Sequence, residues 1–186
     1  MININGIQTC QAPWEIKVFK EELKKVGIGN MAEVGVYMGG TAKIMAEMCP
    51  ISEIYLFDTF EGLPYIDKEN GDGLTEHLKI GDMKEATLEI AEKNLKQFKN
   101  IHIYKGIFPE TSEPIKDKKF IFVHIDTDIY QATKEALEFF YPRTNGTIII
   151  HDYKHHKGVS KATDEFCQEK GLKIEVRSPR QGIIRI

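Results

Sequence analysis

Short β-rich runs alternate along this chain with segments whose apolar residues recur at helical spacing, and this alternation constrains the fold more than any other feature. Parallel strands joined by crossover helices give such a pattern. The expected strands are residues 31–36, 54–57, 101–104, 120–125 and 147–150, and the expected helices are 13–26, 40–48, 84–98, 130–141 and 161–170. We predict one α/β domain over residues 1–186.

The end of the chain departs from this alternation. Two last β-rich runs, residues 173–177 and 182–186, are joined only by Ser178-Pro-Arg-Gln181. So short a link suits a hairpin and makes the last pair antiparallel. The expected fold is therefore a Rossmann-like, doubly wound sheet that is mostly parallel and ends in a C-terminal antiparallel hairpin.

Charge and cysteine content narrow the partners and the compartment. The formal net charge is −3 and there is no long basic run, so we expect neither nucleic acid nor an anionic membrane as a partner. Three cysteines without a CxxC motif fit a reducing compartment. We find no signal peptide and no apolar run near the roughly 20 residues that a spanning helix needs. We expect a cytoplasmic protein with a small-molecule or glycan substrate, and a homo-oligomer stays open.

The run Glu33-Val-Gly-Val-Tyr-Met-Gly-Gly40 places a glycine-rich turn between the first expected strand and the next helix. Glycines let the backbone adopt positive φ and approach a ligand closely, and the helix N-terminus offers free N–H groups to a carboxylate. The dinucleotide fingerprint GxGxxG does not fit, because position 37 is tyrosine. The spacing matches E/D-x-G-x-x-x-G, a form found in adenosylmethionine-binding sites. A tight turn without a ligand is the alternative.

Asp58 follows the second expected strand, 25 residues after Glu33. An acid at this place is well positioned to accept both ribose hydroxyls of a nucleoside, as in NAD or adenosylmethionine. The alternative is a loop or N-cap carboxylate that binds no ligand.

Two polar clusters follow the fourth and fifth expected strands: His124-Ile-Asp-Thr-Asp-Ile-Tyr130, and His151-Asp-Tyr153 with His155 and His156 behind it. Like charges held as close as Asp126 and Asp128 are costly unless a cation or base is present. Neighbouring strands would bring Asp126, His151 and Asp152 to one spot with ligand chemistry for a divalent metal. The alternative is that these acids cap the following helices and that His155 and His156 are solvated.

The segment Asp67-Lys-Glu-Asn-Gly-Asp-Gly73 contains acidic residues that invite a calcium interpretation. The twelfth position of an EF-hand counted from Asp67 is Leu78 and not glutamate, so we reject that interpretation. We expect the long polar segment that contains it to be a mobile lid over the substrate or a solvated insertion.

Several stretches between about residues 30 and 166 resemble the macrocin O-methyltransferase (TylF-type) family of sugar O-methyltransferases. The matching stretches are residues 33–40, 57–64, 105–111, 124–130 with Thr133, and 141–153. The string Phe57-Asp-Thr-Phe-Glu-Gly-Leu-Pro64 is far more specific than the glycine turn. The resemblance implies the class I methyltransferase fold, which is consistent with the predicted sheet and hairpin.

The resemblance also implies a site for S-adenosyl-L-methionine. The glycine turn would hold the amino-acid end of this cofactor, Asp58 its ribose, and the region of Gly81 and Asp82 its adenine. The residues that we assign to this site are Glu33, Gly35, Tyr37, Gly39, Asp58, Thr59, Asp82 and Asp126.

A magnesium ion that binds the acceptor hydroxyl is implied as well, held by Asp126, His151 and Asp152. The family usually has Asp-Asp-Tyr where this chain has His151-Asp152-Tyr153. Histidine is a softer ligand, which favours Mn, Fe or Zn or leaves the metal site incomplete. We predict Asp126 to be catalytic, as metal ligand and proton acceptor, with His155 as the alternative base.

These features together predict an S-adenosylmethionine-dependent O-methyltransferase, assisted by a metal, that acts on a sugar or glycoconjugate hydroxyl. A catechol-type small-molecule O-methyltransferase is a second hypothesis, weakened because such enzymes commonly have a lysine where this chain has Ile129. The unusual His151 and the short chain keep a third open, a non-catalytic S-adenosylmethionine-binding module. An NAD-dependent oxidoreductase is disfavoured by the missing GxGxxG.

Overall fold

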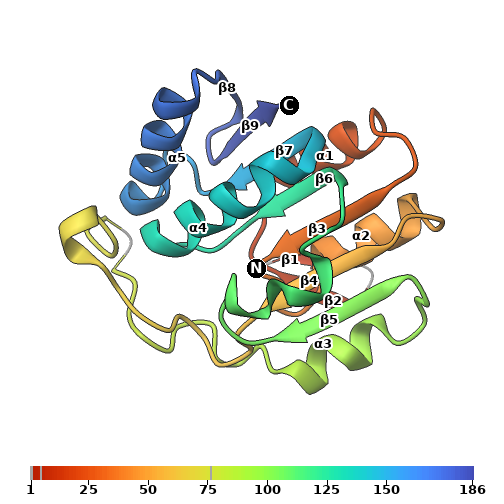
Figure 1. Ribbon diagram of the computed structural model, residues 1–186. Helices are drawn as coiled ribbons and strands as arrows, with labels where there is room; N and C mark the ends of the chain where they lie inside the picture. Colours follow the sequence, from red (N-terminus) through yellow and green to blue (C-terminus); the bar gives the residue numbers. More distant parts are fainter. Residues whose placement is uncertain (1, 5, 76) are drawn as a thin grey trace.

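The computed structural model describes residues 2–4, 6–75 and 77–186. Within these residues, seven strands form one sheet in the order β5-β4-β3-β6-β7-β9-β8, and β1 pairs with β2 in a separate hairpin (Figure 1). The strands are β1 Ile2–Ile4, β2 Ile7–Thr9, β3 Asn30–Val34, β4 Ile54–Asp58, β5 Ile101–Lys105, β6 Phe120–Ile125, β7 Thr144–His151, β8 Ile174–Ser178 and β9 Gln181–Arg185. The α-helices are α1 Pro13–Leu23, α2 Gly40–Met48, α3 Leu88–Leu95, α4 Tyr130–Phe140 and α5 Lys157–Lys170; the 3₁₀ helices are η1 Lys68–Asn70, η2 Glu110–Ile115 and η3 Tyr141–Arg143.

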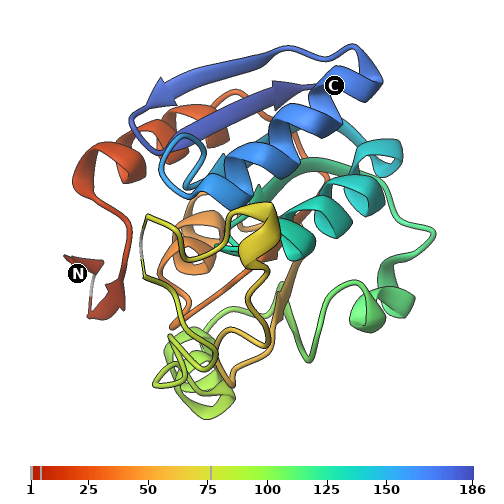
Figure 2. The same ribbon diagram turned by 90° about the vertical axis from the view of Figure 1, so that its left-hand side faces the viewer.

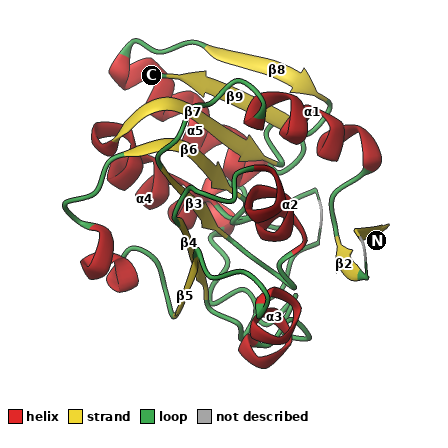
Figure 3. Ribbon diagram, turned by 90° about the vertical axis from the view of Figure 1, so that its right-hand side faces the viewer, coloured by secondary structure: helices red, strands yellow, loops and turns green. Residues whose placement is uncertain are grey.

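The predicted sheet and its hairpin are confirmed. The strands β5, β4, β3, β6 and β7 run parallel, whereas β9 is antiparallel to both β7 and β8. The parallel strands read as nearly continuous apolar runs because helices cover both faces of the sheet. Helices α1, α2 and α3 lie on one face, and α4 and α5 lie on the other (Figure 3).

Each face of the sheet has its own hydrophobic core, because successive side chains of a strand point to opposite faces. In β6, Phe122 packs into the core under α1, α2 and α3, while Val123 and Ile125 pack into the core under α4 and α5. Phe19 of α1 and Phe140 of α4 are fully buried, one in each core.

Two expected helices differ in length from the structure. The helix expected over residues 84–98 is only α3, because Met83 has φ +70° and Thr87 is extended at the N-cap. The helix expected over residues 161–170 begins four residues earlier, at Lys157. The pair of β1 and β2 was not expected. Among the described residues, no helix has the length and apolarity needed to span a membrane.

Candidate functional site

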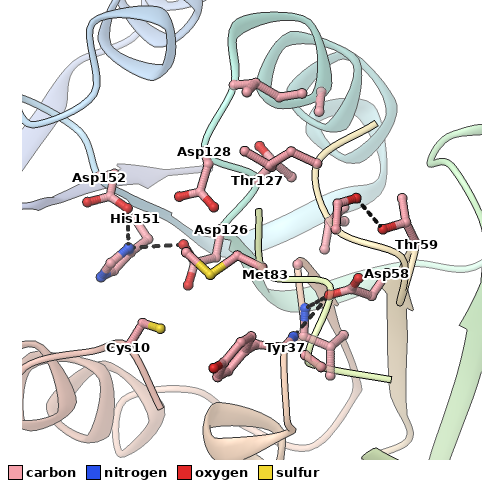
Figure 4. A pocket seen from close by; sticks show the side chains of 18 of the residues that line it. Cys10, Tyr37, Asp58, Thr59, Met83, Asp126, Thr127, Asp128, His151 and Asp152 are labelled. Carbon is pink, nitrogen blue, oxygen red and sulfur yellow. Dashed lines mark hydrogen bonds and ion pairs between the residues drawn. The ribbon is translucent and has the colours of Figure 1, made fainter. Parts of the chain in front are cut away.

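The carboxyl ends of β3, β4, β6 and β7 open onto one cavity of about 340 Å³. This volume lies within the roughly 300–1,000 Å³ of small-molecule pockets, and ligands of open α/β sheets bind beyond the strand ends. Figure 4 shows acidic side chains and an imidazole on one side of the cavity, and Tyr37 and Asp58 on the other. The site residues predicted from the sequence that line the cavity are Gly35, Tyr37, Asp58, Thr59, Asp126, His151, Asp152 and His155. Glu33, Gly39 and Asp82 are described residues that lie outside this lining.

The glycine turn after β3 is shaped by the protein's own packing. Gly35 has φ +88°, and a Cβ atom there would lie 1.9 Å from the carbonyl oxygen of Asp126. Gly39 also has φ +88°, and a Cβ atom there would lie 2.9 Å from the side chain of Leu95 in α3. Tyr37, between the two glycines, has φ +53°. Gly35 is therefore required by the backbone that follows β6. Gly39 is favoured by its positive φ, because the end of the Leu95 side chain could shift.

Asp58, at the end of β4, holds this turn in place. Its Oδ2 accepts hydrogen bonds from the backbone N–H groups of Val36 at 2.7 Å and Tyr37 at 2.9 Å, and its Oδ1 accepts one from Phe60 at 2.8 Å. A carboxylate has about four acceptor positions. Roughly one acceptor position thus remains, although the prediction from the sequence was that Asp58 accepts two ribose hydroxyls. Thr59 lines the cavity and donates to the carbonyl oxygen of Gly62.

Glu33 lies beneath the turn and is fully buried. Its Oε1 accepts a hydrogen bond from the hydroxyl of Thr41 at 2.5 Å and lies 2.7 Å from Nδ1 of His124. Burial raises the pKa of Glu33, and the contacts with His124 and Thr41 offset only part of that effect. Glu33 therefore ties β3 to β6 and α2. Its partner Thr41 lines the cavity, and so does Gln11, which contacts its other partner, His124.

Asp126, His151 and Asp152 come together because β6 and β7 are parallel neighbours. Nδ1 of His151 lies 3.0 Å from Oδ1 of Asp126 and 2.9 Å from Oδ2 of Asp152 (Figure 4). Burial alone would lower the pKa of His151, but the adjacent carboxylates, Asp126 above all, raise that pKa well above its ordinary value. Burial alone would raise the pKa of Asp126, and the contact with His151 outweighs it and lowers that pKa. The three side chains form one tightly coupled ionic cluster.

Three further residues, which we did not predict from the sequence, complete this cluster. Gln11 precedes α1, Glu15 lies in its first turn, and Arg180 lies in the turn between β8 and β9. A signal for Glu15 was present in the sequence, because it shares the apolar face of the first helix with Phe19 and Glu22. Glutamates on a buried helix face require partners. Gln11 and Arg180 carried no comparable signal, since only the fold brings the two ends of the chain to β7.

Asp128, His155 and His156 of the two clusters also line the cavity. Burial, followed by the charges of Asp126 and Asp152, raises the pKa of Asp128 well above its ordinary value. Nδ1 of His156 lies 3.2 Å from the backbone carbonyl oxygen of Asp128. His155, the alternative base, is exposed and lines the cavity.

The region of Asp82 approaches the cavity through its neighbour. Oδ2 of Asp82 accepts a hydrogen bond from the N–H of Lys79 at 2.8 Å, and its carbonyl oxygen accepts one from Leu63. Met83 lines the cavity instead. The assignment of Asp82 to the adenine region stays a prediction. Its neighbour Met83 is the side chain that reaches the cavity.

The long polar segment between β4 and α3 is anchored to two helices. Asp72 is fully buried; its Oδ1 accepts from the N–H of Tyr130 in α4 at 2.8 Å, and its Oδ2 accepts from the N–H of Asp67 at 3.0 Å. Lys161 of α5 donates to the side chain of Asn70. Figure 2 shows this segment, in yellow, beside α4 and α5. Both carboxylate oxygens of Asp72 thus accept hydrogen bonds from backbone N–H groups of the protein.

The sequence of this chain is similar to that of known methyltransferases. The family model for macrocin-O-methyltransferase (TylF) matches residues 15–179. The 8-demethyl-8-(2,3-dimethoxy-alpha-L-rhamnosyl)-tetracenomycin-C 4'-O-methyltransferase of Streptomyces olivaceus is 23% identical over 139 residues, which are 67% of this chain and 53% of that protein. The chain therefore spans about half the length of this curated relative.

Solved structures share the fold at low sequence identity. The O-methyltransferase NovP has a TM-score of 0.79 at 16% identity, over 92% of this chain and 79% of its own. SMU.1697c of Streptococcus mutans, solved in complex with SAH, has a TM-score of 0.61 at 12% identity, over 95% of this chain and 97% of its own. The class I methyltransferase fold expected from the sequence is confirmed. Because the family model covers most of the sequence, the chain belongs to the macrocin-O-methyltransferase (TylF) family.

Proposed function

We propose that this chain is an S-adenosylmethionine-dependent O-methyltransferase that acts on a sugar or glycoconjugate hydroxyl. Membership of the family supports methyl transfer to oxygen. The S. olivaceus relative is named for methylation of a rhamnosyl compound, which supports a sugar acceptor. The SAH bound to SMU.1697c supports the methyl donor, because SAH is what remains of that donor after transfer.

One observation carries the proposal: the glycine turn and the acidic cluster face the same cavity and touch each other. Gly35 packs against the backbone of Asp126, so the end of β3 and the end of β6 are in direct contact. A ligand held by the turn and one held at Asp126 would therefore lie side by side. Methyl transfer needs that arrangement, because the methyl donor and the acceptor oxygen must lie in line. Holding both reactants in this geometry can lower the barrier by up to about 7–11 kcal/mol.

Different residues at the turn would bind different parts of the methyl donor, S-adenosylmethionine. The helix α2 begins at Gly40, and its free N–H groups suit the carboxylate of an amino acid. Asp58 keeps the turn in shape and offers its remaining acceptor position to a ribose hydroxyl. Glu33 lies beneath the turn and orients the hydroxyl of Thr41, which lines the cavity. When bound, the donor supplies a methyl group that its sulfonium has already activated.

The cluster of Asp126, His151 and Asp152 fits a divalent cation. One ligand atom from each residue lies within 4.8 Å of the other two, and carboxylate oxygen and imidazole nitrogen are ordinary metal ligands. When bound, the ion lowers the pKa of a coordinated hydroxyl, so that a weak base suffices. Asp126, which faces the cavity, is the proposed proton acceptor, and His155 at the same cavity is the alternative.

The test is methyl transfer by the purified chain. We expect transfer from S-adenosylmethionine to rhamnosyl or related glycosides, detected by mass spectrometry, and binding of SAH by calorimetry. Asp126→Asn should lower turnover by about 100-fold or more, since general bases contribute on this scale. The control is Asp117→Asn, at an exposed residue outside the cavity, which should leave turnover unchanged.

Other outcomes decide between the hypotheses. Transfer to polyphenols and not to glycosides would favour the catechol-type enzyme. Binding of SAH with no transfer to any acceptor, with or without divalent metal, would favour a binding module. Wild-type turnover in Asp126→Asn would remove Asp126 from the mechanism.

A further inference from the structure

Each of the three side chains in the cluster has a second polar atom that lies beside another residue. Oδ1 of Asp126 faces the common point, and its Oδ2 accepts a hydrogen bond from Nε2 of Gln11 at 3.1 Å. Oδ2 of Asp152 faces the common point, and its Oδ1 accepts from Arg180, from Nε at 2.6 Å and from Nη2 at 2.5 Å. Gln11 and Arg180 thus orient the two carboxylates by binding the oxygens that face away from the common point.

The imidazole of His151 has a charged neighbour on its far side instead of a hydrogen bond. Nδ1 faces the two carboxylates, and Nε2 lies 3.3 Å from Oε2 of Glu15, in a charge contact that is not an aligned hydrogen bond. Glu15 is fully buried, and its Oε2 also accepts from the backbone N–H of Ala12 at 2.6 Å. A metal bound at Nδ1 would require the ring proton to lie on Nε2, and the adjacent carboxylate of Glu15 favours that tautomer.

We propose that Gln11, Glu15 and Arg180 position Asp126, His151 and Asp152 as a centre for a divalent transition ion, such as Mn²⁺, Co²⁺ or Zn²⁺, in preference to Mg²⁺. The proposal deepens the proposed function, on which it rests for the role of the ion, but metal binding itself is measured without methyl transfer. Gln11, Glu15 and Arg180 are positioning residues, because each acts through one ligand.

The selectivity follows from the donor atoms. Mg²⁺ prefers oxygen ligands in nearly octahedral geometry, whereas imidazole nitrogen suits first-row transition ions. The buried Glu15 makes His151 a stronger and better oriented nitrogen donor. The carboxylates of Asp126, Asp152 and Glu15 outnumber the guanidinium of Arg180, so the cluster as a whole attracts a cation.

The test is calorimetric titration of the untagged chain, stripped with a chelator, with Mn²⁺, Zn²⁺ and Mg²⁺ in the absence of a methyl donor. We expect Mn²⁺ and Zn²⁺ to bind at least about 10-fold more tightly than Mg²⁺. His151→Asp, which replaces the nitrogen ligand by oxygen, should reverse this preference. Glu15→Gln should weaken Mn²⁺ binding by about 10- to 100-fold, the usual effect of losing such an outer partner.

The matched control is Glu22→Gln, at the second buried glutamate of α1, whose contacts are with Lys25, Arg177 and Arg185. It should leave the ratio of Mn²⁺ to Mg²⁺ affinity unchanged. If Glu15→Gln fails to fold, Gln11→Ala serves in its place, because it removes one hydrogen bond to Asp126 and should also weaken Mn²⁺ binding.

Three results would overturn the inference: Mg²⁺ binding as tight as Mn²⁺ binding, an unchanged preference in His151→Asp, or equal affinities for Glu15→Gln and Glu22→Gln. A chain that binds Mn²⁺ as expected but transfers no methyl group would overturn the proposed function and leave the metal inference standing. A chain that methylates glycosides but binds none of the three ions would overturn the metal inference alone.

Discussion

At Gly35 a single missing side chain allows two strand ends to meet. The Cα of this residue faces the backbone of Asp126 so closely that a Cβ atom would lie 1.9 Å from its carbonyl oxygen. No rotamer change relieves such a clash, because both partners are backbone. The positive φ of +88° adds a second cost for any other residue.

Gly35→Ala is therefore expected to lower the free energy of unfolding by about 3 kcal/mol or more, through backbone strain and the displacement of β6. Urea unfolding measures this change. The control is Gly27→Ala, where φ is not positive and no atom lies within 4 Å of the added Cβ, and it should change stability little. A Gly35→Ala chain as stable as the Gly27→Ala chain would contradict this account of the turn.

At the scale of elements, the segment between β4 and α3 depends on one buried carboxylate. Asp72 binds the first N–H of α4, and Gly158 of α5 packs directly against its Oδ1, which a Cβ atom at Gly158 would approach to 1.8 Å. Asp72 thus places the segment at the N-termini of both helices. The sequence predicted this segment to be a mobile lid or a solvated insertion. It lies beside the cavity, held at Asp72, and its role as a lid stays a prediction.

Gly158→Ala is expected to push the Asp72 carboxylate away and free the segment. Loss of a buried hydrogen bond costs about 1–3 kcal/mol, so amide exchange at Tyr130 and over residues 66–75 should become about 10-fold faster or more. Exchange in β6 should not change. Lys157→Ala, at the exposed neighbour, is the control. Unchanged exchange over residues 66–75 in Gly158→Ala would show that Asp72 does not anchor the segment.

At the scale of the whole molecule, Glu22 connects the first helix with the last two strands. Its carboxylate is fully buried and lies 2.6 Å from Nη1 of Arg185 in β9, 3.3 Å from Nη1 of Arg177 in β8 and 2.7 Å from Nζ of Lys25. Burial alone would raise the pKa of Glu22, but the hydrogen bonds from Arg185 and Lys25 outweigh burial and lower that pKa. The ionised carboxylate of Glu22 thus stabilises the folded state.

Because the pKa of Glu22 is lower in the folded chain, this stabilisation is complete above the ordinary glutamate pKa of about 4.3 and is lost as the pH falls below it. Glu22→Gln should therefore cost about 2 kcal/mol at pH 7, and its difference from wild type should shrink toward pH 3. Urea unfolding at several pH values measures this, with the half-exposed Glu21 changed to Gln as control. A difference that is independent of pH would contradict the ionic role.

Local properties of the chain determined the order of strands and helices and the C-terminal hairpin. Side-chain periodicity and the length of a link are readable without knowing which segments meet, so the five parallel strands and the pairing of β8 with β9 were predictable. The same holds for the place of Asp58, Asp126 and His151 at the carboxyl ends of strands. The start of the expected helix over residues 84–98 was not predictable, since Met83 adopts a left-handed conformation and Thr87 is extended.

Tertiary structure alone decided what these residues touch. Asp58 uses three of its acceptor positions for backbone N–H groups. Gly35 is required by the close approach of the backbone of Asp126. Glu15 and Arg180, 165 positions apart in the sequence, meet at His151 and Asp152. The physical reason is that hydrogen bonds and ion pairs depend on distances between segments remote in the sequence, which are set only when both faces of the sheet have packed.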